Sequence, residues 1–172
     1  MKVVNCLTVG LVSLAVGCGD ATVDGDPAAS APPADSEFVT QTEPADALPV
    51  GQARESVADG DAVTVVGTIG GSTEPFVEGL AAFTIVDPKV PYCAPEEGCP
   101  TPWDYCCTQD QVKDNIATIK IVDDQGSAVT ADARQLLGVQ ELSTVVVKGT
   151  ASRDDNGNLT VAATEVFVRP VK

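Results

Sequence analysis

The chain has no histidine, few aromatic residues and few positive charges, and each shortage excludes a class of function. Without histidine, the usual Ser–His and Cys–His catalytic pairs and the common imidazole metal ligand are excluded. Only 10 basic residues stand against 25 acidic ones, which gives a formal net charge of −15. Nucleic-acid affinity comes largely from Lys and Arg that neutralise phosphates, so this charge disfavours a nucleic-acid partner.

Aromatic residues make up 4% of the chain although hydrophobic residues make up 44%. Small β-forming residues, above all Val, Ala and Thr, fill the difference, and this composition favours a small β-barrel or sandwich. At 172 residues the chain has room for one domain with accessory segments. No pattern of catalytic residues is present, so we expect a non-enzymatic protein without a cofactor.

The N-terminal residues 1–17 have the pattern of a secretory signal peptide. Lys2 precedes an apolar stretch that is too short to span a bilayer comfortably. The run Leu14-Ala15-Val16-Gly17-Cys18 then resembles the lipobox of bacterial lipoproteins, in which the cysteine becomes the acylated first residue. The resemblance implies lipidation at Cys18 and a cell-envelope location facing the periplasm or exterior. The alternative is an ordinary signal peptide cleaved near Gly17 or Ala21.

Residues 18–50 would form an acylated cysteine and an acidic tether. After Cys18 this segment contains no Lys or Arg and seven acids: Asp20, Asp24, Asp26, Asp35, Glu37, Glu43 and Asp46. Because the segment shows no apolar periodicity, it lacks the surface to offset the entropy of ordering, and we predict disorder. The folded domain is then expected to cover residues 51–172.

Five period-2 segments in this domain predict strands. They are residues 62–70, 80–87, 116–123, 142–151 and 159–169. A short helix is predicted at residues 132–137, ended by Gly138. In the last strand the apolar alternation changes phase, which predicts a β-bulge near Ala163–Thr164. The order β-β-β-α-β-β resembles the OB-fold, so we predict an all-β protein with small α content, built on a five-stranded Greek-key barrel.

Between the second and third strands lies a long insertion, residues 88–115, with four cysteines. Its Cys-Pro-Thr-Pro-Trp-Asp-Tyr-Cys-Cys run, separated from Cys93 by five residues, resembles a stretch in secreted bacterial proteins of unknown function. Four cysteines in an oxidising compartment predict two disulfides that staple the loop, with three possible connectivities. The candidates are Cys93, Cys99, Cys106 and Cys107.

The alternative for these four cysteines is a metal site, since four thiolates alone satisfy zinc. Their spacing departs from the usual C-x₂₋₄-C pattern, and this weakens the metal interpretation. A redox role ranks below both, because acidic rather than basic residues surround the cysteines.

A ligand-binding face is expected where OB-folds generally bind, on the second and third strands and the loops beside them. The candidate residues are Phe76, Trp103, Tyr105, Lys120, Lys148 and Arg153. Trp103 is expected to pack as a lid over one end of the barrel. The expected partners are the membrane through the lipid anchor and an envelope protein, a glycan or a small ligand. Binding of nucleic acid or oligosaccharide is a further alternative.

Overall fold

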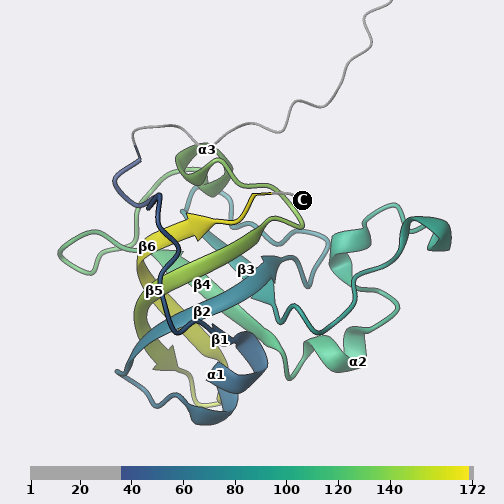
Figure 1. Cartoon of the computed structure of the whole chain (residues 1–172), viewed down its shortest axis with the longest axis horizontal. Helices are drawn as coiled ribbons and strands as arrows, with labels where there is room; N and C mark the ends of the chain where they lie inside the picture. Colours follow the sequence, from purple (N-terminus) through teal and green to yellow (C-terminus); the bar gives the residue numbers. More distant parts are fainter. Residues whose placement is uncertain (1–35, 171–172) are drawn as a thin grey trace, which may run out of the picture.

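Five strands form the body of the molecule (Figure 1) in a computed structural model that describes residues 36–170. The strands are β2 (Ala62–Ile69), β3 (Ala82–Val86), β4 (Ile116–Ile121), β5 (Thr144–Arg153) and β6 (Leu159–Val168). Every one of them overlaps a segment predicted from the sequence. Their inward side chains, among them Val65, Ile85 and Ile119, are completely buried in one core.

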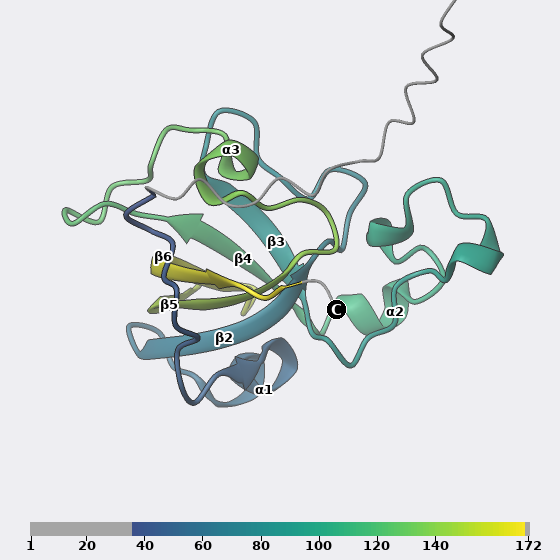
Figure 2. The same cartoon turned by 45° about the horizontal axis from the view of Figure 1, so that its top comes forward.

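The sheet closes into a barrel of OB type, as predicted. Its order is β2-β3-β4-β6-β5, and β5 pairs with β2 to complete the ring. All neighbours are antiparallel except β4 and β6, which run parallel. Strand β2 closes the ring because Ala62–Thr68 pair with β5, while Thr68 and Ile69 pair on their other side with β3. Figure 2 shows the curved strands between α3 and α1.

The predicted β-bulge is present in β6. Lys148 pairs with Glu165 but the next residue, Gly149, pairs with Ala163, so Thr164 is the extra residue. The bulge brings Ala163 and Val166 into the core together. A Cβ atom at Gly149 would lie 2.8 Å from the Cα of Ala163, so this position requires glycine.

The predicted helix is also present, as α3 (Ala133–Leu137). The carboxylate of Asp132 accepts a hydrogen bond from the amide of Gln135 and caps the N-terminus. Gly138 ends the helix in the left-handed conformation, with φ 65°. Ala133 and Leu137 are buried in the barrel core, so the helix covers one end of the barrel.

The predicted tether and domain boundary need correction, because the ordered domain begins before residue 51. Val39 forms a β-bridge with Val166, and the two-residue strand β1 (Leu48–Pro49) pairs with β2. The helix α1 (Val50–Ser56), which was not predicted, follows directly and buries Val50 and Ala53 in the core. Tertiary packing of a few apolar residues therefore orders the acidic segment 36–50. Residues 1–35, including the predicted signal peptide and Cys18, lie outside the described residues.

No helix within residues 36–170 is long and apolar enough to cross a membrane.

Candidate metal centre

The insertion between β3 and β4 projects from the side of the barrel as a separate lobe (Figures 1 and 2). It contains two short 3-10 helices, η1 (Pro95–Glu97) and η2 (Pro102–Asp104), and the helical turn α2 (Gln109–Val112). Cys99 follows η1, and Cys106 and Cys107 follow η2 after one intervening residue, Tyr105. The lobe is thus a chain of tight turns, with the cysteines at the ends of the turns.

A small apolar cluster separate from the barrel core attaches the lobe. Strand β3 alternates, so Ile85 points into the barrel and Val86 points outward to the lobe. Tyr105, 1% exposed, is the largest side chain in this cluster and meets the ring of Tyr92 edge-on at 6.4 Å. The cluster consists of Val86, Val90, Tyr105 and Val112, with Ile116 packed against it.

Two glycines after β2 allow the backbone of the lobe to dock closely. The amide of Gly71 donates to the carbonyl of Trp103 at 2.8 Å. A Cβ at Gly70 would lie 2.5 Å from that carbonyl oxygen and 2.8 Å from Cε2 of Tyr105. The indole Nε1 of Trp103 also donates to the carbonyl of Thr73 at 3.1 Å. Polar contacts and the apolar cluster therefore attach the lobe to the barrel.

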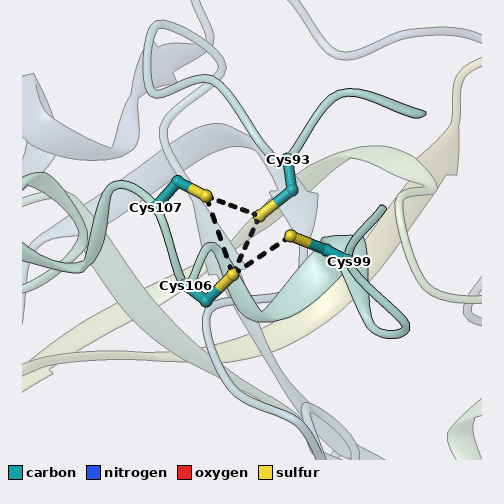
Figure 3. Close-up of side chains that lie close together, drawn as sticks. All are labelled: Cys93, Cys99, Cys106 and Cys107. Carbon is teal, nitrogen blue, oxygen red and sulfur yellow. Dashed lines mark hydrogen bonds between the residues drawn. The ribbon is translucent and has the colours of Figure 1, made fainter. Parts of the chain in front are cut away.

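The four cysteine sulfurs of the lobe converge on one point, as Figure 3 shows. Cys106 Sγ lies 3.3 Å from Cys93 Sγ and 3.3 Å from Cys99 Sγ. Cys107 Sγ lies 3.8 Å from both Cys93 Sγ and Cys106 Sγ. All four sulfurs lie within 4.8 Å of one another, a group that could hold a metal ion.

The predicted disulfides are not found, since all four cysteines in the described part of the chain are free. The prediction assumed two separate pairs of thiols. In the structure Cys106 contacts three sulfurs at once, so the cluster has no unique pairing. The arrangement is a single four-sulfur group.

The sulfurs differ in their environment. Cys93 is 2% exposed, and the backbone N–H of Cys107 donates to its sulfur, which lowers the pKa of the Cys93 thiol. Contacts with the thiols of Cys99 and Cys93 raise the pKa of Cys106 above its ordinary value. The contact with the Cys106 thiol lowers the pKa of Cys107, but contacts with the thiols of Cys93 and Cys99, together with partial desolvation, outweigh it and raise the pKa to about 11. Several thiolates side by side repel one another, so this crowding opposes full ionisation of the group without a cation.

Asp104 fixes the turn that carries Cys106. One carboxylate oxygen accepts from the backbone amide of Cys106 at 2.8 Å, and the other accepts from the hydroxyl of Thr101 at 2.7 Å. The Thr101 hydrogen bond, followed by that of the Cys106 amide, lowers the pKa of Asp104. The next residue, Tyr105, adopts the left-handed conformation with φ 57°. This strained turn buries the Tyr105 ring while it directs Cys106 and Cys107 toward the other sulfurs.

The residues predicted to form a ligand face are not gathered into one surface. Tyr105 is buried in the lobe cluster, and Trp103 joins the lobe to the loop after β2 instead of covering a barrel end. Phe76 packs on Phe83, with the guanidinium of Arg134 stacked over its ring.

The three cations of the predicted ligand face have separate positions. Arg153 donates to the carbonyls of Val57 and Gly157 and so closes the C-terminal end of α1. Lys148 pairs with Glu165 at 2.9 Å. Lys120 is exposed on β4. The role of Arg153 was missed because no sequence pattern indicated the helix that it caps.

Comparison with known proteins found no matching family model and no match among curated proteins.

Proposed function

We propose that this domain binds one thiophilic metal ion, of the Zn²⁺ class, through Cys93, Cys99, Cys106 and Cys107. The observation that carries the proposal is the convergence of four sulfurs within 4.8 Å on a single lobe. With its donor atoms all sulfur, the site suits soft or borderline d¹⁰ ions rather than Mg²⁺ or Ca²⁺, which prefer oxygen.

The spacing of the sulfurs supports tetrahedral coordination. A Zn–S bond of about 2.3 Å in a tetrahedron implies sulfurs about 3.8 Å apart. The measured separations are 3.3 Å for two pairs and 3.8 Å for two more. Small rotations of the exposed Cys106 side chain would bring the shorter pairs to the ideal length. The cysteine spacing departs from C-x₂₋₄-C, but the strained turn at Tyr105 brings the adjacent Cys106 and Cys107 into the same group.

A bound cation would also relieve the electrostatic strain of the group. The contacts that raise the pKa values of Cys106 and Cys107 arise between thiols that compete for protons. A divalent ion at the centre attracts every thiolate at once and reverses this effect. Metal binding releases protons, so we expect affinity to fall as the pH is lowered.

Cobalt titration tests the proposal directly. The full chain is prepared with Cys6 and Cys18 replaced by Ser, so that only the four lobe thiols report. Addition of Co²⁺ should give sulfur-to-cobalt charge transfer and the intense visible bands of a tetrahedral site, saturating at one equivalent. Displacement by Zn²⁺ should abolish the bands.

Variants identify the ligands in the same assay. C93S, C99S, C106S and C107S should each weaken Co²⁺ binding and alter the bands, whereas T108S should leave them unchanged. Thr108 is a suitable control because it lies beside Cys107 and its hydroxyl donates to Pro91, a contact that Ser retains. Absence of the bands in fully reduced protein would overturn the proposal.

We further propose that the domain is a non-enzymatic envelope lipoprotein anchored through Cys18. The support is the lipobox resemblance in the sequence. Two or more acyl chains would anchor stably at about 0.8 kcal/mol per buried CH₂ group. In bacterial cells, radiolabelled palmitate should enter the wild-type chain but not C18S, and globomycin should cause the precursor to accumulate. An unlabelled, cytoplasmic product would contradict the anchor. An envelope protein, a glycan or a small ligand as partner stays a prediction.

A further inference from the structure

The sulfur cluster is buried on one side and open on the other. Cys93 is 2% exposed, whereas Cys106 and Cys107 are exposed and Cys99 is intermediate. The lobe that carries them projects from the barrel (Figure 1), and the exposure of Cys106 and Cys107 shows that their side of the cluster is open to solvent. A metal ion held by this group would therefore be reachable by a further ligand from the side of the adjacent cysteines.

The lobe does not depend on the sulfurs for its attachment to the barrel. Tyr105 is buried among apolar side chains from β3 and α2, and Trp103 bonds to Gly71 and Thr73. A structural zinc site normally supplies the folding energy of a domain that lacks a core of its own. This domain has a complete barrel core and a second apolar cluster, so its stability does not require the metal.

The surroundings leave the thiolates electron-rich. Four thiolates around one divalent ion carry a formal charge of −2. Residues 91–112 contain no Lys or Arg, while Glu96, Glu97 and Asp104 lie among the cysteines. Within residues 91–112 no basic side chain offsets the negative charge on the sulfurs, and the acidic residues attract incoming metal cations.

From these observations we propose that the cluster is a metal-transfer site, which exchanges its ion with thiol-bearing donors and acceptors. The inference rests on the proposed metal binding and adds the class of partner. The incoming thiol loses its proton to solvent and its sulfur bonds to the ion as the bond to Cys107 or Cys106 breaks. The released thiolate then takes up a proton, and the same exchange at the remaining cysteines releases the ion to the acceptor. The ion keeps its charge throughout, so no oxidant or reductant is needed.

The rate law of zinc transfer tests the proposal. The full-length C6S/C18S chain is loaded with Zn²⁺, and release is followed with a chromogenic pyridylazo chelator in the presence of increasing glutathione. Direct attack by the thiol predicts transfer about tenfold faster at ten times the glutathione concentration, since the thiolate enters the rate-limiting step. S-Methylglutathione at the same concentration cannot form a thiolate and should leave the rate of zinc transfer unchanged. A rate independent of glutathione would overturn the proposal.

The order of thiol reactivity gives a second measurement. In the zinc-loaded protein, iodoacetamide should modify Cys107 and Cys106 first and Cys93 last, as mapped by peptide mass spectrometry. Zinc removal should shift the melting temperature of the barrel by only a few degrees. Y92F is the control, because Tyr92 is exposed at the edge of the lobe and the ring is retained; its transfer rate should equal that of the wild type. Uniform protection of all four thiols would contradict the open side.

The two proposals fail in distinguishable ways. Absence of cobalt bands in the reduced protein removes the metal site itself. A normal cobalt spectrum with transfer that is independent of thiol leaves a closed, structural site and removes only the transfer role.

Discussion

Replacement of Tyr105 by Ala should release the lobe while the barrel stays folded. The Tyr105 ring is almost completely buried, and truncation of a buried aromatic side chain to Ala costs about 3–5 kcal/mol. The ring belongs to the cluster under the lobe and not to the barrel core. The loss should therefore appear as local opening of the lobe rather than as global unfolding.

Hydrogen exchange measures this loss residue by residue. The amides of Thr108 and Asn115, which bond to the carbonyls of Tyr105 and Val112, report on the lobe. If Y105A lowers the free energy of lobe opening by about 3 kcal/mol, the protection factors of these amides should fall roughly a hundredfold. A tenfold change in an equilibrium constant corresponds to about 1.4 kcal/mol. Amides in β5 and β6 should be unaffected. Y92A is the matched control, since that ring is 49% exposed, and it should reduce protection far less. Equal losses in the lobe and the barrel would refute the separation of the two clusters.

Three further comparisons test the assignments of single residues. Burial raises the pKa of Tyr105 to about 12, above the ordinary value of 10.0. The associated stability is present below pH 10 and should be lost as the pH rises toward 12. Urea denaturation followed by the fluorescence of Trp103, the single Trp of the chain, should show a smaller loss of lobe stability in Y105F, and equal losses would refute the assignment. G149A should destabilise by about 1–3 kcal/mol through backbone overpacking, whereas T150A, exposed on the same strand, should change stability by less than about 0.5 kcal/mol. R153A should cost about 1–3 kcal/mol because carbonyls at the end of α1 lose their donor, and K148A, which breaks an exposed ion pair, should cost less than about 1 kcal/mol. Equal effects within either pair would contradict the stated contacts.

The barrel could be predicted from the sequence because its signals are local. Alternation of apolar residues defined each strand, and the change of phase after Ala163 located the bulge that the pairing of Gly149 confirms. Asp132 and Gly138 bounded α3 in the same way. These features depend on residues close together in the chain, so neighbouring side chains were sufficient evidence.

The N-terminal part of the domain could not be predicted in this way. Between Ser36 and Ser56 the apolar residues are sparse and follow no period. They become ordered only because Val39 meets β6 and Leu48 meets β2, contacts between residues far apart in sequence. The role of Arg153 was hidden for the same reason, since it donates to the carbonyls of Ala53 and Val57, which lie far from it in sequence.

The cysteine cluster was predicted in composition but not in arrangement. The sequence placed four cysteines in one insertion and offered disulfides first and a metal site second. The left-handed conformation of Tyr105 decides the geometry, because it turns Cys106 and Cys107 toward Cys93. Non-glycine residues rarely adopt this conformation, so spacing alone gave no reason to expect it.

Native mass spectrometry tests the central claim most directly. The C6S/C18S chain is purified without reductant or chelator, and its mass is measured before and after denaturation in acid. The account predicts one bound metal ion per chain in the native spectrum and four free thiols after its release. A metal-free chain lighter by four hydrogens, which is the mass of two disulfides, would contradict it.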